Sequence, residues 1–284
     1  MNLIDIKSVY SVAKKEFMDH IRNKWIVALI IIFIVMTISA SYLAGGKTGS
    51  SEIFGGMEET VVTLVSISTI LIPLISIMLG YATISAEAES GALSIVLSYP
   101  VKRSEVLMGK FLGLGMVIVA SVLSGFGAGG IVIASTAGMS QSGAYLTFIG
   151  LTIILGLLYL SLSICFSSVC KKRTTSIGAG ILIFFWSMIY GMIIFGILLA
   201  TGVSYTDLFT GNATYPDWMW ASLTFSPMDM NQMSVMFAFG IKQAFGFPVE
   251  PPEYMNLNLL VFIQLIWIAV PMLLAYHFFN KRDI

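Results

Sequence analysis

The stretch that decides the fold runs from Phe111 to Cys170 and reads FLGLGMVIVASVLSGFGAGGIVIASTAGMSQSGAYLTFIGLTIILGLLYLSLSICFSSVC, without one Asp, Glu, Lys or Arg. A helix needs about 20 apolar residues to cross the roughly 30 Å hydrocarbon core of a bilayer, and a charged residue at its centre costs about 2.5–3.5 kcal/mol. The stretch is too long for one span, and its midpoint, Gly138 to Gly143, is a polar, glycine-flanked turn. We expect two spans, at 111–136 and 145–169.

Four further stretches without charge are each long enough for one span: Trp25–Gly46, Thr60–Ala86, Thr174–Thr206 and Tyr254–Asn280. Of the 284 residues, 57% are hydrophobic and only 11% are charged, whereas soluble domains carry about 25% charged residues. The pattern predicts an all-α, polytopic membrane protein, a single transmembrane domain over 1–284 with six helices. The four remaining spans are expected at 25–44, 61–83, 175–200 and 257–279.

The first span has a cleavable signal peptide as its alternative, because basic residues precede it and small residues follow, at Ser39, Ala40 and Ser41. The apolar run of a signal peptide is only about 7–15 residues long and lies close to the N-terminus. Here the run is longer and begins after residue 24. We therefore expect an uncleaved span.

Basic residues near span ends accumulate on the cytoplasmic side of a membrane, and they divide sharply in this chain. Thirteen of the 15 Lys and Arg residues fall on one face with seven acids, whereas Lys47, Lys242 and eight acids fall on the other. The net charge of zero therefore hides a basic face and an acidic face. We expect a multi-pass protein of the cell membrane with both termini cytoplasmic, which an even number of spans requires.

The segment 1–24 is predicted to be an amphipathic helix at the cytoplasmic membrane interface, in contact with lipid headgroups. Its apolar residues recur at helical spacing, at Ile6, Val9, Ala13, Phe17 and Ile21. The alternative is an ordinary juxtamembrane tail. Its basic residues stand beside acids and no further basic surface extends them, so we expect no nucleic-acid partner.

The segment 84–110 is predicted to be a cytoplasmic loop that contains a short apolar helix. From Glu87 to Lys110 it reads EAESGALSIVLSYPVKRSEVLMGK. Acidic residues favour a helix start, Pro100 stops that helix, and Ser104 with Glu105 begins a second helix that continues into the span at 111–136. A partner protein could push against the short helix. The residues alone equally allow a purely structural hairpin.

The same loop resembles that of ABC transporter permeases of the ABC-2 type, in particular the six-span membrane subunits of nitrous-oxide-reductase maturation systems. Further matches are the basic N-terminal helix, Ser226-Pro227-Met228-Asp229, and the ending Phe279-Asn280-Lys281-Arg282-Asp283-Ile284. The resemblance implies a second copy of the chain and a coupling helix that docks on a separate cytoplasmic ATPase, which binds the ATP and Mg. It places the ATPase-coupling positions at Glu87, Glu89, Gly91, Pro100, Arg103 and Lys110, while Ala92 stands where the family has a small hydroxyl residue.

The segment 201–256 is predicted to be a long extracytoplasmic loop. It contains a cluster of methionines, Met228, Met230, Met233 and Met236. Thioethers are soft ligands that suit Cu(I), so a copper contact is one interpretation, and an apolar helix at the membrane interface is the favoured one. The loop could also bind an extracytoplasmic partner.

Sequence motifs that would indicate catalysis, nucleotide binding or metal binding are incomplete in this chain. Gly45-Gly46-Lys47-Thr48 resembles the end of a phosphate-binding loop, but Ser41 stands where the first glycine is required. His20 and His277 lie far apart in the sequence, and Cys165 and Cys170 fall on different helix faces. We expect no catalytic, metal or cofactor site in the chain.

The spans carry no Asp, Glu, Lys or Arg at membrane depth, whereas ion-driven transporters use such groups. We therefore predict a non-catalytic permease subunit of an ABC exporter. An ion-driven transporter or channel, an embedded enzyme, and an ABC-type force transmitter acting on an extracytoplasmic partner are the alternatives. Two GxxxG steps, Gly109–Gly113 and Gly125–Gly129, allow close helix packing, within one chain or between two.

Overall fold

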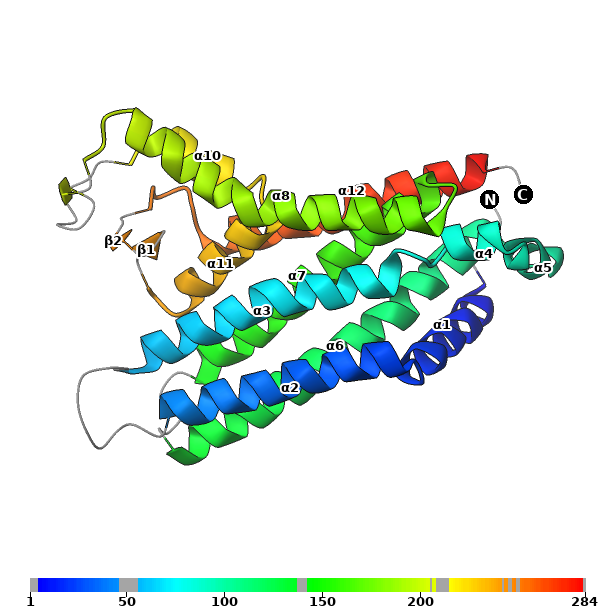
Figure 1. Cartoon of the computed structure of the whole chain (residues 1–284), viewed down its shortest axis with the longest axis horizontal. Helices are drawn as coiled ribbons and strands as arrows, with labels where there is room; N and C mark the ends of the chain where they lie inside the picture. Colours follow the sequence, from blue (N-terminus) through cyan, green and yellow to red (C-terminus); the bar gives the residue numbers. More distant parts are fainter. Residues whose placement is uncertain are drawn as a thin grey trace.

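The computed structural model describes residues 5–45, 56–136, 142–204, 206–207, 215–241, 243–244, 247–248 and 251–282. Six described helices are long and apolar enough to cross a bilayer, and they run side by side (Figure 1). They are α2 (Lys24–Gly45), α3 (Gly56–Gly80), α6 (Arg103–Thr136), α7 (Ser142–Val169), α8 (Arg173–Ala200) and α12 (Leu257–Lys281). Each predicted span overlaps one of them along most of its length, which confirms the all-α, six-span prediction.

Both chain termini lie at one end of the bundle, which we call the terminal end (Figure 1). The same end carries three shorter helices, α1 (Ile6–Ile21), α4 (Ser85–Glu89) and α5 (Ala92–Ser98). The opposite end carries α10 (Asp217–Leu223) and the antiparallel two-residue strands β1 (Gln243–Ala244) and β2 (Phe247–Pro248). Lys47, Lys242 and the predicted turn around Gly138 lie outside the described residues.

The central helix of the bundle is α7, which packs against α12, α3, α6, α8 and α11 (Pro227–Ala238). Its small polar residues allow this close approach and bond to neighbouring backbone. The Ser163 hydroxyl donates to the Ile77 carbonyl at 3.1 Å. The Ser167 hydroxyl accepts from the backbone N–H groups of Ile84 and Ser85, each at 2.9 Å, and so fixes the start of α4.

Both GxxxG steps of α6 pack within the chain. A Cβ on Gly109 would lie 2.6 Å from Val12 Cβ of α1, and a Cβ on Gly129 would lie 2.8 Å from the Ser41 hydroxyl of α2. Glycine at these positions therefore lets α1 and α2 lie directly against α6. This supports packing within one chain as the role of both steps.

The structure corrects the prediction for the methionine cluster. Its helix, α11, lies inside the bundle instead of at an interface, and Met228, Met230, Met233 and Met236 are all buried. Asn231 Nδ2 donates to the Leu151 carbonyl of α7 at 2.8 Å. The polar side chains of α11 find partners inside the bundle, as Asn231 and Ser234 do, so the helix can be buried together with its methionines.

The four methionines are divided between two hydrophobic clusters. Met228, Met230 and Met233 belong to the hydrophobic cluster that α7 forms with α8 and α10, whereas Met236 belongs to the cluster around α6. This distribution is typical of side chains that fill a core. It fits the apolar interpretation of the cluster better than a copper contact.

Candidate functional site

The predicted coupling loop is a two-turn hairpin at the terminal end. α4 ends at Glu89, and Gly91 then takes a φ of 75°, a left-handed conformation that favours glycine. This reversal starts α5, which ends at Ser98 before an extended Tyr99 and the exposed Pro100. The residue before a proline is biased against helix, so the sequence itself limits α5 to two turns. A short apolar helix does lie before Pro100, but Gly91 separates it from the acidic residues that were expected to start it, which lie in α4 instead.

One side of α5 faces the solvent or a partner. Leu93 is fully buried and anchors the helix, whereas Ile95 is 65% exposed and Tyr99 is 67% exposed. The neighbouring Ser94 and Ser98 are exposed as well. Two large apolar side chains are thus left exposed in this hairpin, where a partner could cover them. We call Ile95 and Tyr99 the docking face.

A buried charge cluster stands directly behind this hairpin. Lys110 of α6 is 2% exposed, and its Nζ lies 2.8 Å from Glu16 Oε1 of α1 and 2.7 Å from Glu87 Oε1 of α4. The more exposed Lys15 reaches the same carboxylates, at 3.4 Å from Glu16 and 3.9 Å from Glu87. We call Glu16, Glu87 and Lys110 the buried triad. It ties three helices together at one point.

The short contacts of the triad pair opposite charges. Burial by itself would raise the pKa of the Glu16 carboxyl, but Lys110 together with the nearby Lys15 and His20 outweighs burial and holds this pKa below its usual range. Removing one partner from a buried ion pair costs about 3–5 kcal/mol, because it leaves the other charge uncompensated. The triad therefore makes the junction of α1, α4 and α6 a rigid unit.

Arg103 connects the start of α6 with the end of α12. Its Nη1 donates to the carbonyl oxygens of Phe279 at 2.5 Å, Asn280 at 2.9 Å and Arg282 at 2.9 Å. The guanidinium carbon also lies 5.6 Å from the centre of the Phe279 ring. The last carbonyls of a helix have no partner within it, and Arg103 supplies one.

Arg282 extends this connection to α7. Its Nη1 donates to the carbonyls of Ser167 and Ser168, each at 3.2 Å, and its Nη2 donates to the Lys171 carbonyl at 3.3 Å. The C-terminal end of α12 is thus attached to both α6 and the end of α7.

Two carboxylates hold helix starts. Glu89 Oε2 accepts from the backbone N–H of Arg173 at 3.1 Å, at the first residue of α8. Glu105 accepts from the backbone N–H of Asp5 at 2.9 Å and from that of Lys102 at 3.0 Å. A carboxylate at a helix N-terminus satisfies free N–H groups and the helix dipole. Glu89 therefore links the hairpin to α8, and Glu105 links α6 to α1.

All six residues predicted for coupling lie at the terminal end, but they do not form one cluster. Glu87 and Lys110 meet in the buried triad, whereas Arg103 binds the end of α12 and Glu89 binds the start of α8. The remaining two bound the short helix α5. The predicted residues are therefore the frame of the hairpin, and the exposed side chains that it presents are Ile95 and Tyr99.

Sequence reasoning missed three residues that complete this frame, namely Glu16, Glu105 and Arg282. Glu16 carries a usable signal, because it lies three residues after Ala13 and is an acid beside the apolar stripe of α1. Glu105 was expected only at the start of the second helix, where it does accept from the nearby Lys102 N–H. Its bond to Asp5 and the bonds of Arg282 join groups that are distant in sequence, and such contacts leave no periodic pattern.

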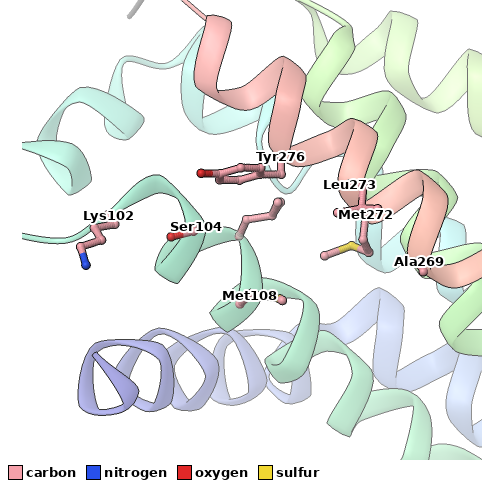
Figure 2. A pocket seen from close by; sticks show the side chains of 8 residues that line it. Lys102, Ser104, Met108, Ala269, Met272, Leu273 and Tyr276 are labelled. Carbon is pink, nitrogen blue, oxygen red and sulfur yellow. The ribbon is translucent and has the colours of Figure 1, made fainter. Parts of the chain in front are cut away.

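A lateral groove of about 710 Å³ lies beside the hairpin, between α6 and α12 (Figure 2). Its walls are mainly apolar, and Leu273 and Met108 on its rim are 68% and 46% exposed. The groove therefore opens to the side of the bundle. It is lined by Lys102, Ser104, Leu107, Met108, Ala269, Met272, Leu273 and Tyr276.

Six apolar helices, of which α7 is the most buried, with a braced two-turn helix between the second and third spans, define a multi-pass membrane protein of the permease class. The chain belongs to the ABC-2 family of transporter proteins, whose family model matches residues 10–284. The resemblance predicted from the loop is thereby confirmed.

Two relatives are each described as a probable ABC transporter permease protein NosY. The chain is 27% identical to the relative from Pseudomonas aeruginosa over 282 residues, which cover 97% of this chain and 99% of the relative. It is 28% identical to the relative from Stutzerimonas stutzeri over 290 residues, which cover 98% of this chain and 99% of the relative. The similarity thus extends over the whole length of the chain.

Proposed function

We propose that this chain is the non-catalytic, membrane-spanning subunit of an ABC exporter, and that it couples ATP hydrolysis by a separate ATPase subunit to transport. The ATP and Mg would bind to that ATPase. The observation that carries the proposal is the docking face, because Ile95 is exposed on a short helix, and Tyr99 directly after it, in a hairpin that is braced against the bundle.

The hairpin contacts suggest how force would spread. A push on α5 passes along the chain through residues 99–102 into α6. It also passes to α1 through the buried triad, to α8 through Glu89, and to α12 through Arg103. A displacement of one short helix would thus act on several membrane helices together.

The proposed orientation places the terminal end in the cytoplasm, where ATP is available. The basic residues near the span ends favour this side, and the docking face lies at the same end as both termini (Figure 1). The acidic segment 201–256 would then be extracytoplasmic.

A second copy of the chain is part of the proposal, because ABC ATPases are expected to work as a pair. The exposed side of α8 is a candidate contact surface, since Leu182 and Met192 are 72% and 69% exposed there. Lipid would cover whatever part of this surface the second copy leaves free.

One observation favours the force-transmitter alternative for the same ATPase-coupled machine. α11 lies within the bundle against α7, α8 and α12, while the adjoining β1–β2 pair lies at the opposite end. Movement of the spans would therefore reach the surface at that end, where an extracytoplasmic partner could receive it. Flux of a cargo that depends on ATP would favour the exporter, and ATP turnover without flux would favour the transmitter.

The proposal is tested by co-purification with the ATPase encoded beside this chain. Tyr99→Ala is expected to weaken the complex at least tenfold, because it removes one of the two large side chains of the docking face. Tyr254→Ala is the matched control, since Tyr254 is also exposed, at 48%, but follows β2. Equal recovery of the ATPase with both variants, or no complex with the unaltered chain, would refute the assignment.

A further inference from the structure

Asp229 lies deeper in the bundle than its place in a loop segment suggests. α10 and α11 form a helical hairpin, and Ser226 at its turn donates from Oγ to the Ser187 carbonyl of α8 at 3.3 Å. A Cβ on Gly191 of α8 would lie 2.6 Å from Asp229 Oδ1. Gly191 precedes the end of α8 by nine residues, or about 13 Å at 1.5 Å per residue. The carboxyl group therefore sits near the middle of a membrane-spanning helix.

This position adds to the expectation that the spans themselves carry no acidic group at membrane depth. The expectation holds for the six spans, but the α10–α11 hairpin brings an acid in from the segment between two of them. Among the described residues, no Lys, Arg or His forms an ion pair with Asp229. An unpaired carboxylate in such surroundings is costly, and the usual response of the group is to bind a proton.

Asp229 Oδ2 is buried and has no hydrogen-bond partner among the described residues. The Tyr159 hydroxyl interacts with this carboxyl and also with the Ser187 side chain. Tyr159 is fully buried and Ser187 is 1% exposed. Unpartnered buried polar atoms are rare in native proteins and need an explanation. A proton on Oδ2 supplies one, because it removes the charge of the carboxylate and turns that oxygen into a donor from which the nearby Tyr159 hydroxyl can accept.

We infer that Asp229, with the Tyr159 and Ser187 side chains near it, is a proton-binding site where the α10–α11 hairpin packs into the bundle. We call the hairpin seated when it is packed in this way. The proton comes from water when the hairpin is seated and returns to water when the hairpin leaves the bundle. The site needs no other ligand. Among the described residues no group of three or more His, Cys, Asp or Glu side chains is placed to hold a metal ion.

The groups that face Asp229 allow this titration. Tyr159 comes from α7 and Tyr190 from α8, and both phenols interact electrostatically with the carboxyl. α12 faces α11 with Gln264, which does not titrate and donates to the Ser234 hydroxyl at 2.9 Å. Burial raises the pKa of the Asp229 carboxyl to about 6, even though the Ser226 hydroxyl and the backbone of Gly191 partly lower it.

The raised pKa of Asp229 determines how the packing of the hairpin into the bundle depends on pH. A carboxyl whose pKa is higher in the seated hairpin than in water binds more protons when seated. Seating is therefore most favourable below about pH 4, the usual range for Asp. It weakens as the pH rises from about 4 to about 6, and it is constant above that range.

The test is infrared spectroscopy of the purified full chain in nanodiscs of uncharged lipid, titrated with acid and alkali. The expected result is a protonated-carboxyl band that disappears with a midpoint near pH 6. The band should be absent from Asp229→Asn and unchanged in Asp217→Asn, which removes an exposed acid of α10. Because the isolated chain is used, this result is independent of the proposed ATPase coupling.

A second variant keeps the inference testable if Asp229→Asn does not fold. Asp229→Glu keeps an acid but moves it by one methylene group, so the band should persist with a shifted midpoint. The inference is overturned if the unaltered chain shows no carboxyl that titrates above about pH 5. It is also overturned if the band survives in Asp229→Asn or keeps its midpoint in Asp229→Glu.

Discussion

The Lys110 ammonium lies 2.7 Å from Glu87 Oε1 and is itself almost completely buried. The two residues are the last and the first charged positions of the segment that reads EAESGALSIVLSYPVKRSEVLMGK. Their contact closes that segment into a loop at its base. The loop is therefore an insertion with a fixed base, and its tip, α5, is the part free to contact another protein.

Loss of the Lys110 charge should destabilise the protein strongly. In Lys110→Met, Glu16 and Glu87 remain close to each other without their shared cation, and we expect a loss of about 3–5 kcal/mol. Unfolding in detergent by a chemical denaturant measures it. Lys14→Met, at an exposed position of α1, should change the unfolding free energy by less than about 1 kcal/mol. Equal effects of the two variants would refute the bracing role of the triad.

The stability supplied by Glu16 should depend on pH in a defined direction. Its native pKa is lowered by Lys110, so its contribution is complete above its usual pKa of about 4.3 and is lost as the pH falls through the native value. The stability advantage of the unaltered chain over Glu16→Gln should therefore be constant near neutral pH and shrink below about pH 4. An advantage that grows on acidification contradicts this assignment.

The packing of α1 on α6 should be sensitive to one methyl group. Gly109→Ala places a Cβ 2.6 Å from Val12 Cβ, and such overpacking costs about 1–3 kcal/mol. The matched variant Gly127→Ala is on the same helix, where no atom lies within 4 Å of the added Cβ. It should be neutral or stabilising, by up to about 1 kcal/mol, because alanine favours helix. Thermal unfolding of both variants gives the comparison, and an equal response would exclude tight packing at Gly109.

Arg103→Lys should loosen the end of α12. Lysine keeps the positive charge but cannot match a planar guanidinium that bonds to the carbonyls of Phe279, Asn280 and Arg282. Amide hydrogen exchange over 276–282 should accelerate by about tenfold or more, which corresponds to roughly 1.4 kcal/mol of local stability. Arg173→Lys, at the exposed first residue of α8, is the control, and acceleration in both variants would contradict the specific role of Arg103.

The six spans could be predicted because a charge at membrane depth is costly, so the uncharged stretches directly mark the helices. The hairpin could be predicted in outline as well, since Gly91 and Pro100 impose local backbone conformations. The contacts inside the hairpin could not be predicted. Lys110 meets Glu16 across 94 positions of sequence, and no local pattern encodes such a pair.

The buried position of α11 also could not be predicted from local sequence patterns. An apolar, methionine-rich segment between polar loops has the same composition whether it lies on a membrane or inside a bundle. Only the space left among α7, α8 and α12 decides between these positions. Asp229 was therefore read as part of a motif in a loop, and its depth in the bundle was not foreseen.

The most direct test of the central claim is photo-crosslinking in cells from a benzophenone side chain at position 95, on the docking face. The account predicts that the ATPase subunit is captured from this position and not from position 254, after β2. Capture of the ATPase from position 254 instead of position 95, or no capture from position 95 when both subunits are present, would contradict the account.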